Sequence, residues 1–302
     1  MECFECGKDA VIYLPYTNKN LCKKHFVKMF EKRFRKTVRE FNFIKKNDIV
    51  VVGLSGGKDS TVLLHLLASL RKDLPFKLKA LTIDEGIKNY RPKTMKVAKK
   101  EAKKLNVPLT ILSFKKEAGK TLDEIFKKKK ELPCSYCGVI RRYLLNKGSK
   151  KLKATKLAIG HNLDDVAQTV LMNVMRNEPL RLVRYNEPLI QDKKFIPRIR
   201  PLMRTPEKEI AVYAMLKGID ITHIPCPYAE FAFRQDIRRV LNELEEKYPG
   251  NKFRIANSFI SMQKWMKEGL KNEKFELDYC PQCKEPSSEG KCMYCSMMEK
   301  LG

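Results

Sequence analysis

Short apolar runs alternate with longer segments of helical periodicity along most of the chain. Buried strands are expected at residues 49–52, 78–84, 108–113 and 156–160, which are rich in Val, Ile and Leu and bounded by polar residues. Helices are expected after three of them, at residues 61–67, 92–106 and 164–176. Repeated alternation of strand and helix predicts an α/β domain, a parallel sheet wound in both directions.

Helical periodicity also occurs outside this core. Residues 26–43 predict a basic amphipathic helix, and residues 206–217, 234–248 and 253–270 predict three more helices. Residues 177–203 are rich in Arg and Pro and show little periodicity, so we expect a loop that faces the cleft.

A glycine pair lies between the first expected strand and its helix, in Leu54-Ser55-Gly56-Gly57-Lys58-Asp59-Ser60. Adjacent glycines let the backbone expose its N–H groups, and the following helix adds the positive end of its dipole, so this loop favours an anion. A Walker loop would need Gly at Val52 and Ser or Thr at Asp59, and a dinucleotide fingerprint fails after Gly53. The remaining match, Ser-Gly-Gly-Lys-Asp-Ser, resembles the signature of PP-loop ATPases, which cleave ATP between its α and β phosphates.

Two further residues are expected beside this ATP-binding loop. The carboxyl ends of parallel strands form one rim, where such sheets bind ligands. Ile83 and Gly160 end two of the expected strands, so an adenosine could bridge them while its phosphates occupy the loop. Asp165 begins the next helix on the same rim; we expect a functional role for it, although acids there also act as simple caps. His161 is as consistent with a structural role as with a catalytic one.

Two four-ligand sets near the ends of the chain have the spacing of structural zinc sites. The first, with a small hairpin between its pairs, is Cys3, Cys6, Cys22 and His25. The second is Cys280, Cys283, Cys292 and Cys295. Closed sets of four ligands indicate a structural metal rather than a catalytic one.

Three more cysteines lack a fourth local partner. Cys134 and Cys137 are separated by two residues, and Cys226 lies far downstream in a proline-rich setting. Three ligands suit a metal with one open position, where chemistry takes place. Zinc, a cubane iron–sulfur cluster and a redox pair that carries persulfide all remain compatible with this pattern.

The charge of the chain adds a partner to this picture. With 62 Lys and Arg against 35 Asp and Glu, the 302-residue chain carries a net charge of +27 at pH 7, which indicates a polyanion, and nucleic acid first. No apolar stretch approaches the length of a membrane span, and the first residues do not form a signal segment. We therefore expect a cytoplasmic protein without a membrane partner.

Taken in order, these motifs resemble the TtuA-type tRNA 2-thiouridine synthetases, relatives of the tRNA 2-thiocytidine enzyme and of the cytosolic wobble-uridine thiolases. The resemblance implies that ATP adenylates the C2 oxygen of a tRNA uridine, that pyrophosphate is released, and that sulfur then replaces the oxygen. It implies a [4Fe-4S] cluster on Cys134, Cys137 and Cys226, and a requirement for Arg141 and Asp165. Asp59 would position Mg²⁺ or the phosphates.

Other properties of the family leave choices open for this chain. The sulfur donor is either a ubiquitin-like protein thiocarboxylate or inorganic sulfide, and the target is either the wobble uridine or position 54 of the T loop. A homodimer is compatible with the family, although no residue pattern here indicates one.

The resulting division of the chain has four parts. They are a zinc ribbon (residues 1–27), a basic linker helix (28–47), the PP-loop catalytic domain with the cluster site (48–272) and a four-cysteine zinc module (273–302). Two other functions fit the motifs less completely. One is another PP-loop adenylating enzyme, for amidation or sulfate reduction, with a redox cysteine pair. The other is a zinc-stabilised RNA-binding protein whose nucleotide loop is degenerate.

Overall fold

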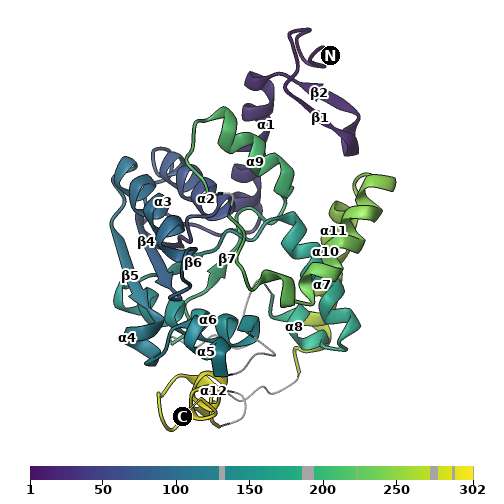
Figure 1. The fold of residues 1–302 in the computed structure, drawn as a ribbon. Coiled ribbons are helices and arrows are strands. Elements are labelled where there is room, and N and C mark those ends of the chain that lie inside the picture. Colours follow the sequence, from purple (N-terminus) through teal and green to yellow (C-terminus); the bar gives the residue numbers. More distant parts are fainter. Residues whose placement is uncertain (129–132, 186–193, 223, 273–277, 288–289, 302) are drawn as a thin grey trace.

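A five-stranded parallel sheet forms the centre of the molecule in the computed structural model (Figure 1). The structure describes residues 1–128, 133–185, 194–222, 224–272, 278–287 and 290–301. The strands are β3 (Ile49–Gly53), β4 (Lys77–Asp84), β5 (Leu109–Ser113), β6 (Lys156–Ala158) and β7 (Arg198–Ile199). Their order is β5-β4-β3-β6-β7, which confirms the expected doubly wound α/β fold.

Helices cover both faces of this sheet. The side chains of β3 show why the strands of the sheet are continuous apolar runs in the sequence. Val50 and Val52 pack on the face covered by α2 (Lys58–Leu70) and α3 (Arg91–Lys104), whereas Val51 packs on the opposite face. That second face is covered by α4 (Phe114–Ala118), α5 (Leu122–Lys128) and α6 (Pro133–Lys151). Both faces of β3 are therefore buried, so its residues do not have to alternate between apolar and polar.

The strand order places a topological switch point between β3 and β6. From β3 the chain moves outward through β4 to β5, and it then returns to add β6 and β7 on the other side. Because the crossovers diverge on the two sides of this point, the carboxyl ends of β3 and β6 leave a crevice between them. The loop of residues 54–57, which follows β3, lies at this crevice.

Most of the expected helices are confirmed to within a few residues. They correspond to α1 (Lys23–Glu40), α2, α3, α7 (Leu163–Met175), α9 (Glu207–Leu216), α10 (Arg234–Lys247) and α11 (Asn251–Gly269). The prediction of a loop over residues 177–203 is wrong in two places, because α8 (Pro179–Val183) and β7 form there; residues 186–193 of that range lie outside the described residues. The helices α4, α5 and α6 were not predicted.

The N-terminal segment forms the expected hairpin and docks on the catalytic domain. Its strands are β1 (Ile12–Leu14) and β2 (Lys19–Leu21), joined by the turn η1 (Pro15–Thr17). In α1, Phe26, Phe30 and Phe34 form one fully buried stripe, and Phe30 stacks on Tyr213 of α9 with ring centroids 4.2 Å apart. The basic helix expected here is thus packed against the core along its apolar side, and both lie at one end of the molecule (Figure 1).

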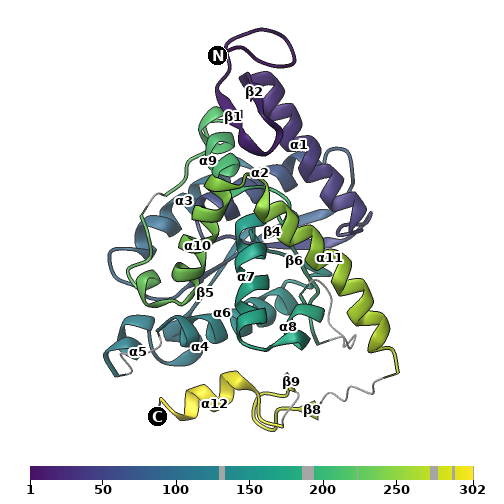
Figure 2. The same ribbon diagram turned by 90° about the vertical axis from the view of Figure 1, so that its right-hand side faces the viewer.

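The C-terminal segment packs at the opposite end of the molecule, against α6 (Figure 2). It contains β8 (Asp278–Tyr279), β9 (Pro286–Ser287) and α12 (Met293–Glu299). Tyr294 stacks on Tyr143 of α6 with ring centroids 3.8 Å apart, and the Glu285 carboxylate pairs with Lys150 at 2.6 Å. The proposed boundary at 272/273 adjoins residues 273–277, which lie outside the described residues, so the four-part division stays a prediction. Of the helices that the structure describes, none has the length and apolarity needed to cross a membrane.

Candidate nucleotide and cluster site

The loop of residues 54–60 is held in shape by its own hydroxyl groups. The Oγ atoms of Ser55 and Ser60 lie 2.9 Å apart, the Ser60 hydroxyl donates to the carbonyl oxygen of Gly57 at 3.1 Å, and the Gly57 N–H donates to Ser55 Oγ at 3.3 Å. Gly56 has a φ of +85°, and a Cβ there would lie 1.9 Å from the Thr94 carbonyl oxygen. Only glycine fits this position without strain, so the conformation of the loop depends on it.

The other expected nucleotide residues lie around this loop. Leu54 is buried and its backbone is used by the sheet: its N–H donates to Leu81, and its carbonyl accepts from Thr82. The carbonyl of Ile83 accepts from Arg91 at 2.5 Å. Gly160 lies against the start of α2, where a Cβ would come within 2.9 Å of the Ser60 nitrogen. The rim predicted from the sequence therefore exists, and Gly160 has a packing role in it.

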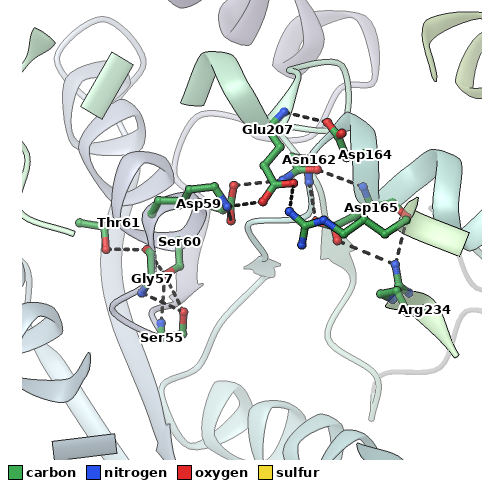
Figure 3. A network of polar contacts seen from close by, with 12 residues as sticks. Ser55, Gly57, Asp59, Ser60, Thr61, Asn162, Asp164, Asp165, Glu207 and Arg234 are labelled. Carbon is green, nitrogen blue, oxygen red and sulfur yellow. Dashed lines mark hydrogen bonds and ion pairs between the residues drawn. The ribbon is translucent and has the colours of Figure 1, made fainter. Parts of the chain in front are cut away.

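Acidic and basic side chains from four elements converge on the start of α2 (Figure 3). Lys58 Nζ lies 3.0 Å from Asp59 Oδ2 and 2.6 Å from Glu207 Oε1 of α9. Arg238 of α10 pairs with the other oxygen of Glu207 at 2.5 Å. Glu207 is a residue that the sequence did not single out, because its contact with Lys58 spans 149 positions. The lysine of the loop is held between two carboxylates.

Asn162 joins this group to Asp165. Its side-chain amide donates to Asp59 Oδ1 at 3.0 Å, and its carbonyl oxygen accepts from the Asp165 N–H. The Asp165 carboxylate accepts from the Asn162 N–H at 3.1 Å, which completes a capping box at the start of α7. Asp165 is therefore a cap, and Arg234 of α10 also lies 3.8 Å from it. Capping and a functional role are compatible for this residue.

Burial raises the pKa of both Asp59 and Asp165. It raises the pKa of Asp59, against the opposing effects of Lys58 and of the Asn162 amide. Burial raises the pKa of Asp165 to about 6, with Asp59 and Glu207 adding to the shift and Arg234 opposing it. Asp165 consequently changes charge near neutral pH, as groups in functional sites often do.

A buried arginine links the loop to the expected catalytic residue Arg141. Arg91 is 2% exposed, donates to the Ser55 carbonyl at 2.9 Å, and pairs with Glu85 at 2.7 Å. The second oxygen of Glu85 lies 3.9 Å from Arg141 Nη1. The sequence did not single out Arg91 or Glu85. Glu85 directly follows the expected strand 78–84, at the rim where such sheets bind ligands, whereas Arg91 lies seven residues beyond the end of that strand.

The three central cysteines come from two segments. Cys134 and Cys137 lie three residues apart at the start of α6, so both are on one helical face, and Arg141 is one turn further along it. The Cys134 thiol donates to the Tyr228 carbonyl at 3.2 Å, which holds the segment of Cys226 beside this helix. Burial raises the pKa of Cys137 to about 12, and Arg141 opposes this shift.

The chemistry of these three thiols fits an iron–sulfur cluster. Four thiolates on one zinc ion lie roughly 3.8 Å apart, given Zn–S bonds of about 2.3 Å. Among the described residues, the two terminal groups are the sets of three or more candidate ligands whose atoms all lie within 4.8 Å of one another. A cubane spreads its cysteines because each binds a different iron. Cys137 and Cys226 also pack against the apolar cluster below the sheet, so the three thiols fit a partly enclosed iron–sulfur cluster.

The terminal groups have the geometry of single-ion sites. Cys3 Sγ lies 3.4 Å from His25 Nδ1, Cys6 Sγ lies 3.8 Å from Cys22 Sγ, and Cys283 Sγ lies 3.5 Å from Cys292 Sγ. Burial acts to raise the pKa of Cys3, but backbone hydrogen bonds from Cys22 and Glu5 outweigh it and lower that pKa to about 6. The residues of both groups fit a tetrahedral metal such as zinc.

Two known protein families match this chain, one over the catalytic domain and one over the N-terminal segment. Residues 26–244 match the PP-loop domain, and residues 2–27 match the N-terminal LIM domain of the 2-thiouridine synthetase TtuA. The tRNA 2-thiolation protein NcsA of Haloferax volcanii is 36% identical over 100% of this chain and 99% of its own length. The chain belongs to the PP-loop family of tRNA 2-thiolation proteins.

Other members of the family show the same extent of similarity. The tRNA-5-methyluridine(54) 2-sulfurtransferase of Pyrococcus horikoshii is 35% identical over 98% of this chain and 93% of its own. The U34-tRNA thiolase NcsA of Methanococcus maripaludis, solved with its [4Fe-4S] cluster, superposes with a TM-score of 0.84 at 34% identity and covers 100% of this chain and 97% of the other. The resemblance drawn from the motifs is thereby confirmed.

The shifted pKa of Asp165 predicts a pH-dependent stability. Its folded pKa of about 6 lies above the unfolded value of 3.8, so the folded chain binds the extra proton, and wild-type stability falls as pH rises through this window. Asp165→Asn keeps an acceptor for the capping box and removes the charge. Above pH 6 the variant should be more stable by about 1 kcal/mol, a value reduced for partial exposure.

Chemical denaturation of both proteins across this pH range measures the difference. The difference in stability between the variant and the wild type should vanish near pH 4, where the Asp165 carboxyl of the wild type is protonated. Asp236→Asn, at a carboxylate that is 62% exposed, is the matched control and should change little at either pH. A variant that is less stable than the wild type at high pH would contradict the assigned shift.

Proposed function

We propose that this chain is an ATP-dependent tRNA-uridine 2-sulfurtransferase that converts a uridine of tRNA to 2-thiouridine. The observation that supports this most is the chain of polar contacts from the phosphate loop through Arg91 and Glu85 to Arg141, on the helix that also carries two of the central cysteines. An ATP loop and a sulfur-handling site on one rim suit a reaction that first activates an oxygen and then replaces it. The names of its relatives, which include tRNA 2-thiolation and 2-sulfurtransferase activities, support the same reaction.

In the first step the uridine C2 oxygen attacks the α-phosphorus of ATP. The new O–P bond forms as the bond to the β-phosphate breaks, and pyrophosphate leaves. Ser55, Gly56, Gly57 and Ser60 would cradle the phosphates, and Lys58 would move from Glu207 toward them. Asp59 would hold Mg²⁺, while the adenosine would lie between Ile83 and Gly160 beside Leu54.

In the second step sulfur attacks C2, and AMP leaves with the former uridine oxygen. Arg141 would stabilise the negative charge that develops on the oxygen, and Asp165 would orient the base or the incoming sulfur. Cys134, Cys137 and Cys226 would hold a [4Fe-4S] cluster, which when bound offers an iron with an open position for sulfide. The sulfur would come from inorganic sulfide, or from a ubiquitin-like protein thiocarboxylate whose acyl carbon–sulfur bond water cleaves, which releases the donor protein as a carboxylate.

The remaining parts of the chain would serve the RNA and the fold. Each terminal ligand group would hold one structural zinc ion, and the net charge of +27 would attract the tRNA. Relatives named cytoplasmic tRNA 2-thiolation protein 1, such as that of Danio rerio at 36% identity over 100% of this chain and 88% of its own, support a place in the cytoplasm. A homodimer would be compatible with this function.

Replacing Lys58 tests the ATP step. Lys58→Met should reduce thiolation of an unmodified tRNA transcript by roughly 100-fold or more, because the cation that would neutralise the phosphates is lost. The Kd for tRNA should stay within about twofold, since the RNA contacts lie elsewhere. Lys208→Met, an exposed position on α9, is the control and should keep full activity. Wild-type thiolation by Lys58→Met would refute the assigned role.

The cluster and the zinc ions can be separated by two matched substitutions. Cys226→Ser, purified without oxygen, should lose its brown colour and its iron but keep two zinc ions per chain. Cys280→Ser should lose one zinc ion and keep the colour, because its ligand group is at the far end of α6. Elemental analysis and visible absorbance measure both. Full thiolation by an iron-free Cys226→Ser protein would show that the site has been misassigned.

A further inference from the structure

Arg200 is a buried cation for which the described part of the chain supplies no counter-charge. The residue is 8% exposed. Its guanidinium carbon lies 4.0 Å from the centroid of the Tyr185 ring. Within the described residues, no atom accepts a hydrogen bond from its Nε or Nη1, and no carboxylate lies within ion-pair distance. Burying an unpaired charge is costly, so such a group is usually completed by a ligand of opposite charge.

Further arginines surround the same position. Arg198 donates to the carbonyl of Arg142 at 3.2 Å, and neither side chain has an acidic partner among the described residues. Burial, together with Arg142 and Arg200, lowers the pKa of Arg198 to about 10. Burial and then Arg200 also act to lower the pKa of His161. Arginines that repel one another in a partly buried site favour the binding of an anion between them.

The sheet places this group beside the phosphate loop but not within it. Arg200 directly follows β7, so it lies on the same carboxyl rim as His161 and Asp165. β6 separates β7 from β3, which sets the end of β7 roughly 10 Å from the phosphate loop. The adenosine positions are Ile83, at the end of β4, and Gly160, just after β6, whereas Arg200 follows β7, one strand beyond β6. An anion at Arg200 is therefore distinct from the phosphates that Lys58 faces.

We propose that Arg200, with Arg198 and Arg142 beside it, binds a backbone phosphodiester of the RNA next to the nucleotide that enters the site. This inference rests on the proposed function and adds to it the residue that would hold the substrate backbone. The planar guanidinium suits the two oxygens of a phosphate, and its burial would strengthen the contact. Arg200 would act as a positioning residue, since it contacts the backbone and not the reacting base.

The test compares Arg200→Met, Arg200→Lys and the surface control Arg239→Met, whose arginine is 70% exposed. The Kd for an unmodified tRNA transcript is measured from low to high potassium chloride, the Kd for ATP is measured without RNA, and the thermal midpoint is measured without ligand. Arg200→Met should raise the tRNA Kd about tenfold at low salt and reduce the salt slope by about one ion, with an unchanged Kd for ATP.

The two other variants make the result specific. Arg200→Lys keeps the charge, so it should keep the salt slope and lose only part of the affinity, and Arg239→Met should match the wild type. Without ligand, Arg200→Met should melt no lower than the wild type, because an unpaired buried charge has been removed.

Three results would overturn the proposal. The first is a folded Arg200→Met protein whose tRNA binding has the wild-type salt slope. The second is a weaker affinity for ATP with unchanged tRNA binding, which would assign the anion to the nucleotide. A large drop in the ligand-free melting temperature of both Arg200 variants would assign Arg200 to the fold. Absence of tRNA binding by the wild-type chain would instead contradict the proposed function itself, and this proposal with it.

Discussion

The hydrogen bond from the Asn162 amide to Asp59 joins the loop after β3 to the loop after β6, across the switch point of the sheet. The geometry of the site depends on this contact. Asn162 also caps α7 and fixes Asp165, while Asp59 fixes Lys58, which Glu207 holds from α9. These contacts join the two sides of the site, and opposing cations keep its carboxylates close together. Fixed charges of this kind suit the transfer of an adenylyl group, in which negative charge develops on the leaving pyrophosphate.

A second set of contacts connects this nucleotide side to the cysteines. Arg91 and Glu85 form a buried pair, and each of them also reaches outward, to Ser55 and to Arg141. A buried ion pair adds little net stability, because its desolvation offsets the attraction. Its position in the middle of the rim suits a positioning role, because it connects the loop that would bind ATP to the helix that carries Cys134 and Cys137.

The sequence predicted those parts of the site that local pattern determines. Adjacent glycines, a strand before them and a helix after them are all close in the chain, so the turn from β3 to α2 could be predicted from the sequence. The strand β7 was missed because its two residues, Arg198 and Ile199, have no periodicity to detect. The start of α6 was missed because Pro, Cys, Ser and Gly at residues 133–138 are typical of a turn. Partners such as Glu207 and Arg200 depend on tertiary structure, and no local signal marks them.

The central claim is that the uridine C2 oxygen is activated as an adenylate before sulfur enters. A tRNA transcript whose uridine carries ¹⁸O at C2 tests it most directly, with mass spectrometry of the AMP formed during thiolation. The account predicts that the label appears in the phosphate of AMP, in proportion to the 2-thiouridine produced. Label released into water, or ATP hydrolysed to ADP while 2-thiouridine forms, would contradict it.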